Sequence, residues 1–134
     1  DGEVGVAPAR RLDIADGAAA VGAAPFVAGS LDAVVCINMI HISPWRCAAG
    51  LCEFASAVLK PGGVLFLYGP FFVDGETPAP SNEAFDASLR ARDESWGVRR
   101  LGEVVALALE HGLEFESRHA MPANNLSVVW RRSA

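Results

Sequence analysis

Two unbroken apolar runs mark the middle of the chain. They cover Leu31 to Met39 and Val64 to Tyr68, and each is too continuous to alternate and too short to be a helix, as expected of strands buried on both faces. Between them, from residue 48 to residue 59, apolar residues recur at steps of three and four, which indicates one face of a helix that ends at Pro61-Gly62-Gly63. Strand, helix and strand in this order predict a right-handed parallel crossover.

The pattern changes to helices and then to a hairpin after residue 69. A Gly/Pro-rich loop leads to a helix for which Ser81 is the expected N-cap, and a second apolar helical face ends before Gly112. Leu113 to Ala120 and Leu126 to Arg131 follow as two strands joined by a turn. We therefore expect an α/β fold with a sheet of parallel strands, helices on both faces and an antiparallel carboxyl-terminal hairpin.

Residues 1–30 carry a weaker pattern. They are rich in Gly and Ala, and a short edge strand at Ala9 to Ile14 is the one regular element that they predict. The chain accordingly divides into a lead-in over residues 1–30 and the carboxyl-terminal part of an α/β domain over residues 31–134. In such sheets a first strand and its glycine-rich turn precede the central strand, whereas almost nothing precedes it here.

Composition narrows the class of protein. The chain has 134 residues, enough for one core, and its 51% hydrophobic residues argue against general disorder. A net charge of −5 argues against nucleic-acid binding, and no apolar run is long enough to span a membrane. The cysteine count of 3, with Cys36 inside an apolar run, favours a soluble protein of a reducing, intracellular environment. Cys47 and Cys52 lack the partners of a metal site, so we expect no metal.

Polar residues follow both apolar runs. Because ligands of open α/β sheets bind at the carboxyl ends of the strands, Asn38, His41 and Tyr68 are candidates for a ligand site. Asn38 could instead satisfy neighbouring backbone groups, and His41 could be a structural histidine. A hydrolase is disfavoured, because no G-x-S-x-G elbow is present and neither Ser43 nor Ser81 has a histidine and an acid in a suitable order.

Longer motifs add a family resemblance. The segments CINMIHISPW, LYGPF, SNEAFDASLRARDESWGVR and MPANNLSVVW resemble the class I SAM-dependent methyltransferase-like family that includes methyltransferase-like protein 26. The resemblance covers residues 31–132 and, more loosely, residues 11–15. It implies a partial Rossmann-like sheet, S-adenosylmethionine (SAM) as cofactor, and methyl transfer to an unidentified small molecule or protein.

The resemblance assigns the cofactor side of the site to two segments. Asp13 matches a position that contacts the adenine amino group, although its carboxylate could equally cap its own turn. Asn38, Met39 and Ile40 match the segment that lines the methionine end of the cofactor and the methyl-transfer channel. His41 follows them as a candidate base or substrate contact, although transfer from a sulfonium often needs alignment alone.

The substrate side falls on later segments. Tyr68 is a second weak catalytic candidate, and the resemblance places Asn82, Arg90 and Arg92 in a lid over the substrate. The two arginines could hold an anionic substrate, or Arg90 could simply pair with an acid one helical turn away. Asn124, with its neighbour Asn125, could supply polar atoms to the pocket or turn the final hairpin.

The chain departs from the family pattern at its start. The glycine-rich turn that cradles the cofactor and the acid that holds its ribose are absent, so SAM binding and activity are not expected of these residues alone. The Leu31 to Met39 strand should then have an unpaired apolar edge, which we expect an upstream segment or a partner chain to cover. The alternative is a degenerate domain that serves as a structural or interaction subunit of a larger assembly.

Overall fold

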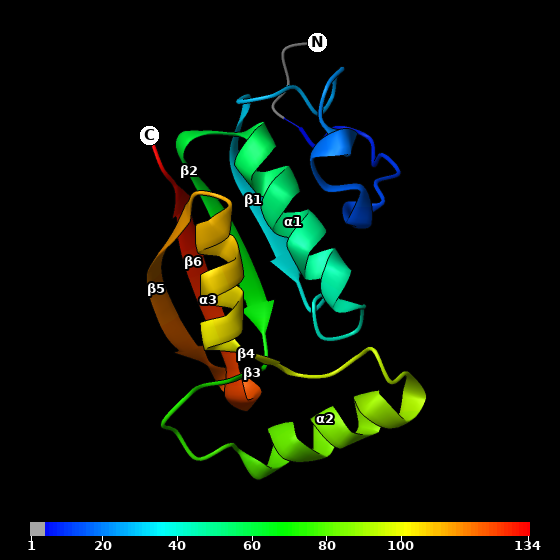
Figure 1. The fold of residues 1–134 in the computed structure, drawn as a ribbon, viewed down its shortest axis with the longest axis vertical. Coiled ribbons are helices and arrows are strands. Elements are labelled where there is room, and N and C mark those ends of the chain that lie inside the picture. Colours follow the sequence, from blue (N-terminus) through cyan, green and yellow to red (C-terminus); the bar gives the residue numbers. More distant parts are fainter. Residues whose placement is uncertain (1–4) are drawn as a thin grey trace.

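The computed structural model describes residues 5–134, and its centre is a mixed sheet of four strands. Their order in the sheet is β1 (Leu31–Ile37), β2 (Leu59–Gly69), β6 (Asn125–Arg132) and β5 (Leu113–Met121) (Figure 1). β1 and β2 are parallel, whereas β6 runs antiparallel to both of its neighbours. The expected α/β fold with a parallel crossover and an antiparallel carboxyl-terminal hairpin is confirmed.

Two long helices lie together over one face of this sheet. α1 (Trp45–Val58) and α3 (Leu101–Glu110) contact each other and share one core with the inner residues of β2 and β6 (Figure 1). Gly112 follows α3 with a φ of 74°, so the expected glycine end of this helix is confirmed. Fully buried members of the core include Ala55, Leu59, Leu65, Leu113, Val128 and Trp130.

The other face of the sheet differs from the expectation. Within residues 5–134, both helices that share the sheet's core lie on the same face, so helices on both faces are not found. Val35 and Ile37 of β1 point away from the core and are 60% and 58% exposed. The prediction that the first strand is fully buried is therefore wrong, since only its alternate residues meet the core.

β1 also forms one edge of the sheet. Among the residues that the structure describes, β1 pairs with β2 alone, and its other side has no strand partner. The unpaired apolar edge expected for this strand is thus observed in these residues.

A third helix closes the end of the sheet at which β1 and β2 terminate. α2 (Pro80–Arg92) lies across this end, and short strands β3 (Phe71–Phe72) and β4 (Arg99–Arg100) pair with each other beside it (Figure 1). Ser81 is inside the helix, which starts one residue earlier with Pro80, so the prediction of Ser81 as N-cap is wrong. A short turn, η2 (Pro122–Asn124), joins β5 to β6.

The lead-in forms no strand in the part that the structure describes. η1 (Ile14–Ala20) follows an irregular stretch, and the edge strand expected at Ala9 to Ile14 is not found. A strand requires a neighbour for its backbone groups, and no described residue offers one there. η1 instead packs against α1, where a Cβ at Gly50 would overlap the carbonyl oxygen of Ile14. Residues 1–4 of the predicted lead-in lie outside the described range.

None of the helices formed by residues 5–134 is both long and apolar enough to cross a membrane.

Candidate functional site

The site begins where β1 ends. The N–H of Asn38 donates to the carbonyl oxygen of Tyr68 at 2.8 Å, which holds the ends of β1 and β2 together. Asn38 has a φ of 53°, a left-handed conformation that asparagine tolerates better than most residues. The next turn is closed by Ser43, whose hydroxyl donates to the carbonyl oxygen of Met39 at 2.8 Å. This sharp turn sends the chain from the sheet into α1 and presents residues 38–41 at the carboxyl end of the strand.

His41 is the buried titratable group of this turn. It is 3% exposed, its ring lies edge-on to that of Phe85 with centroids 5.6 Å apart, and its carbonyl oxygen accepts a hydrogen bond from Gly97. Burial, and secondarily the positive charge of Arg99, lower the pKa of His41 from its ordinary value. The imidazole is therefore neutral at neutral pH and can accept a proton or a hydrogen bond.

Arg99 braces the same turn from β4. Its Nε donates to the carbonyl oxygen of Ile40 at 3.0 Å, and its Nη2 donates to that of Ser43 at 2.8 Å. Its guanidinium also stacks on the ring of Trp45, 5.4 Å from the centroid. The acceptors of Arg99 are backbone carbonyls, which no sequence pattern encodes.

Asparagine side chains connect α2 to the hairpin. Nδ2 of Asn82 donates to the carbonyl oxygen of Asn124 at 3.1 Å, and Nδ2 of Asn124 donates to the hydroxyl of Ser81 at 2.9 Å. Nδ2 of Asn125 donates to the hydroxyl of Tyr68 at 3.2 Å. These bonds join the end of β2, the start of α2 and the turn before β6.

A cavity of about 440 Å³ opens between these elements. It is enclosed by the β1 turn, the start of α2 and the β5–β6 turn, and it has no charged side chain in its wall. The lining residues are Asn38, His41, Ile42, Pro70, Ser81, Asn82, Phe85, Ala123 and Asn125.

A second cavity of about 250 Å³ lies beside the first and shares Asn82 and Asn125 with it. Asn124 and the apolar side chains of Phe71, Met121 and Leu126 also line it.

The structure gathers part of the predicted site. Asn38, His41 and Asn82 line the larger cavity, and Asn124 lines the smaller one. Tyr68 lines neither, but its hydroxyl accepts a hydrogen bond from Asn125, which lines both.

Met39 and Ile40 belong to the same turn but face inwards. Ile40 is buried in the core and Met39 packs against it, while the sulfur of Met39 accepts a hydrogen bond from Ser43. A contact between Ile40 and a ligand would therefore come from its backbone, whereas Met39 is only partly buried.

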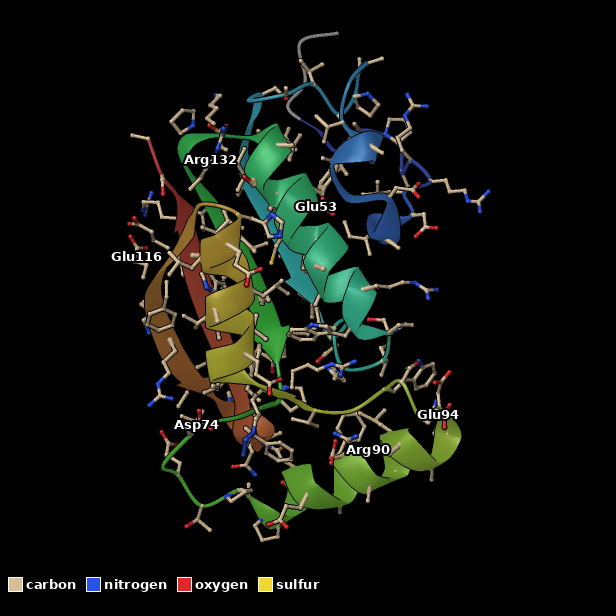
Figure 2. All side chains as sticks on the ribbon, in the orientation of Figure 1. Glu53, Asp74, Arg90, Glu94, Glu116 and Arg132 are labelled. Carbon is tan, nitrogen blue, oxygen red and sulfur yellow. The ribbon has the colours of Figure 1, made fainter. Side chains whose placement is uncertain are left out.

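The remaining predicted residues line neither cavity. Nε of Arg90 donates to both carboxylate oxygens of Asp86, and Arg90 lies between α2 and the segment that leads to α3 (Figure 2). Arg92 stacks on Trp96 at 5.5 Å. Asp13 caps η1 by accepting a hydrogen bond from the N–H of Ala15, which is the alternative role considered for it.

Two residues of the site escaped sequence analysis. The sequence assigned no part in the site to Phe85, yet its ring packs on His41. At Gly69 an added Cβ would lie 3.3 Å from both Oδ1 of Asn38 and Cε1 of His41, so the missing side chain makes room for these groups. A glycine directly after a buried strand was the available signal for this close approach.

With this geometry established, comparison with known proteins identifies the family. The family described as protein of unknown function DUF938 matches residues 4–132. The chain belongs to this family. The match spans the lead-in, the sheet and the helices α1, α2 and α3, and it includes every residue that lines the two cavities.

Solved structures place the fold of this DUF938 chain among class I methyltransferases. The mitomycin 7-O-methyltransferase MmcR superposes with a TM-score of 0.69 at 20% identity, covering 80% of this chain and 31% of that one. Human N-acetylserotonin methyltransferase, in complex with SAM, gives 0.65 at 15% identity, covering 77% of this chain and 30% of that one. A putative methyltransferase in complex with the Haloferax volcanii Trm112 methyltransferase activator superposes with a TM-score of 0.62 at 13% identity, covering 82% of this chain and 57% of that one. The chain thus spans about a third of the first two structures and little more than half of the third.

Proposed function

We propose that this chain forms part of a SAM-dependent methyltransferase whose transfer site is the cavity at the carboxyl ends of β1 and β2. The observation that carries the proposal is the presence of Asn38 and His41 in the wall of one 440 Å³ cavity at these ends. This is where ligands of open α/β sheets bind. The methyltransferase fold of the solved structures, one of them in complex with SAM, supports the same assignment.

The residues present suit one end of the cofactor. The amide of Asn38 has no hydrogen bond to another described side chain, and the absent side chain of Gly69 leaves space beside it. Bound SAM supplies an electrophilic methyl group. Asn38 would hold its methionine end, with Met39 and Ile40 contributing backbone groups. Asp13 would join this set if its carboxylate exchanged the bond to Ala15 for one to the adenine amine.

The acceptor would lie against His41. The neutral, buried imidazole would take the proton that the attacking atom loses, which helps only acceptors that must lose one. Tyr68 would act as a positioning residue, because its hydroxyl fixes Asn125 rather than lining the cavity. Asn82 and Asn124 would hold the acceptor in the two cavities. The substrate would be a small molecule or a protein segment.

A further strand completes the proposed enzyme. β1 presents an edge without a partner among the described residues and exposes Val35 and Ile37 beside it. We propose that a preceding segment or a partner chain adds a strand to this edge and supplies the glycine-rich turn. The Trm112 complex among the solved structures supports the idea of a protein partner for this fold. Kinship with methyltransferase-like protein 26 belongs to the same proposal and rests on the four segments quoted above.

One alternative function has its own supporting observation. A degenerate methyltransferase-like domain would keep the sheet but lose the cofactor turn, and no glycine-rich turn follows an apolar strand in this sequence. Such a domain would use its open sheet edge to join an assembly.

Calorimetric titration of SAM separates the two functions. It is applied to this chain and to the natural gene product that contains it, and we expect heat of binding from the latter and none from residues 1–134 alone. Asn38→Gly keeps the left-handed backbone but removes the amide, and should weaken SAM binding by about tenfold, or roughly 1.4 kcal/mol. Ala7→Gly, in the exposed irregular stretch before η1 and outside the lining of both cavities, is the control. Absence of binding by both proteins would reject the enzyme and favour the degenerate domain.

A further inference from the structure

We propose that the methyl acceptor held in the paired cavities is an uncharged ligand that carries hydroxyl or N–H groups, and that acceptors bearing a carboxylate or a phosphate are rejected. This inference names the substrate class of the methyl-transfer site and rests on the proposed function for the fate of the ligand. It replaces the anionic substrate suggested by Arg90 and Arg92 in the sequence.

The first argument is charge. No Asp, Glu, Lys or Arg lines the larger cavity. The arginines near it are engaged elsewhere: Arg90 with Asp86, Arg92 with Trp96, and Arg99 with backbone carbonyls. In the smaller cavity the one charged residue, Glu76, is paired with Arg118 at 2.8 Å. An anionic acceptor entering either cavity would lose its hydration without gaining a free cation, which is costly, whereas the carboxylate of SAM is accompanied by the ammonium group of the same molecule.

The second argument is the direction of the amide groups. Nδ2 of Asn82 donates to the carbonyl oxygen of Asn124, and Nδ2 of Asn125 donates to the hydroxyl of Tyr68. The Oδ1 atoms of both side chains accept no bond from the described residues and belong to residues that line both cavities. Asn82 is only 8% exposed, and its oxygen is not among the inaccessible unpartnered atoms of the described residues, so a ligand in the cavity can reach it.

His41 adds a further acceptor to this set. Its ring makes no hydrogen bond to the described residues, and one nitrogen of a neutral imidazole always accepts. A neutral ligand with hydroxyl or amide groups can donate to these acceptors while it also accepts from the N–H groups of Asn38 and the O–H group of Ser81, which line the same cavity.

The third argument is shape. The ring of Phe85, with Ile42 and Pro70, gives the larger cavity an apolar wall, which suits a planar ring. Because Asn82 and Asn125 line both cavities, a ligand that binds these oxygens can extend into the second. A ring with a donor group at each end matches this arrangement.

A pair of probes of equal size tests the inference without SAM. para-Hydroxybenzamide is neutral and has donors at both ends, whereas para-hydroxybenzoate replaces the amide with a carboxylate. Each is titrated into the ¹⁵N-labelled chain and followed by NMR. We expect the neutral probe to bind at least about tenfold more tightly, roughly 1.4 kcal/mol. It should shift the side-chain amide signals of Asn82 and Asn125.

A charge placed at the cavity provides the second measurement. Ser81 is exposed and lines the larger cavity, so Ser81→Lys puts a cation at its rim and should raise the affinity for the carboxylate relative to the amide. Ser88→Lys adds the same charge to an exposed position of α2 outside the cavity lining and should leave the ratio unchanged.

The outcomes are distinct from those of the SAM titration. Equal or tighter binding of the carboxylate to the unmodified chain, shifts away from the two cavities, or no binding of either probe would each overturn the inference. Preferential binding of the amide in a protein that never binds SAM would reject the methyltransferase and leave a neutral-ligand site.

Discussion

At the scale of single residues, the site depends on groups kept in uncommon states by their neighbours. His41 stays neutral because it is buried and Arg99 lies close by, and the pKa of Arg99 is itself lowered, chiefly by burial. Asn38 holds a left-handed backbone at the end of β1. Gly69 leaves the space in which both side chains lie. Each of these conditions can be changed separately.

The lowered pKa of His41 predicts how stability depends on pH. The folded chain binds the His41 proton less tightly than the unfolded chain, whose value is near 6.5. The free energy of unfolding should therefore be highest above this value and fall as the pH drops below it. Chemical denaturation over a pH series measures this slope. His41→Phe should flatten it, whereas His119→Gln, on an exposed part of β5, retains His41 and should keep it. An unchanged slope in His41→Phe would contradict the prediction.

Gly69 predicts a steric effect on binding. In Gly69→Ala the new Cβ lies 3.3 Å from Oδ1 of Asn38 and from Cε1 of His41, so both groups must move by a few tenths of an ångström. We expect a folded chain with several-fold weaker binding of para-hydroxybenzamide, measured by NMR titration. Gly22→Ala, where the Cβ would meet nothing within 4 Å, is the control. Equal binding by both variants would show that the ligand lies elsewhere.

At the scale of elements, a few polar contacts hold α2 to the β5–β6 turn and to the segment before β4. Oδ1 of Asp86 accepts from the buried N–H of Val98 at 2.8 Å and from Arg90, and Asn82 reaches Asn124 on the other side of the helix start. An added Cβ at Gly97 would lie 2.9 Å from Asp86 Oδ1, so the linker and the helix are in close contact. This arrangement fixes Phe85 over His41.

Removing the carboxylate of Asp86 should loosen this helix. Asp86→Ala leaves the buried N–H of Val98 without its acceptor, which costs about 1–3 kcal/mol. Urea denaturation measures the loss, and hydrogen exchange at Val98 should become faster. Glu83→Ala changes an exposed acid in the first turn of the same helix and should cost no more than about 1 kcal/mol. Similar costs for the two variants would argue that Asp86 does not tie α2 down.

At the scale of the whole molecule, the sheet is closed on one face and open on the other. α1 and α3 bury one face, while β1 leaves an edge free and exposes Val35 and Ile37. An apolar strand with an open edge is a template for pairing with another strand. The fold is therefore complete as a core but incomplete as a sheet within the residues described.

This open edge predicts self-association of the isolated chain. Val35→Lys places a charge beside the edge, where it opposes pairing, and should make the sedimentation coefficient independent of concentration. Leu109→Lys replaces an equally exposed apolar residue on α3, also 60% exposed, and should retain the behaviour of the unmodified chain. A chain that sediments as a monomer at all concentrations would contradict the prediction.

The elements that the sequence predicts well are those whose signal is local. The parallel crossover, α1, α3 with Gly112 and the final hairpin follow from apolar spacing and glycine positions, and all are present. Asn38 and His41 could be predicted to lie together because both follow the carboxyl end of β1, and both line one cavity. Asn82, which lines the same cavity, was predicted from the family resemblance alone. The start of α2 was misplaced by two residues, since the helix begins with Pro80 after Ala79 as N-cap, and not after Ser81.

By itself, the sequence determined the order of strands and helices, the gathering of Asn38 and His41 at the end of β1, and the open edge of β1. Only the tertiary structure decided which side chains remain free for a ligand. In the folded chain Arg90 pairs with Asp86 and Arg99 donates to backbone carbonyls. Asp13 caps η1, and the ring of Phe85 packs on His41. The physical reason is that apolar periodicity acts through neighbours in sequence. A hydrogen bond to a backbone carbonyl 59 residues away, as between Arg99 and Ile40, exists only once the chain has folded.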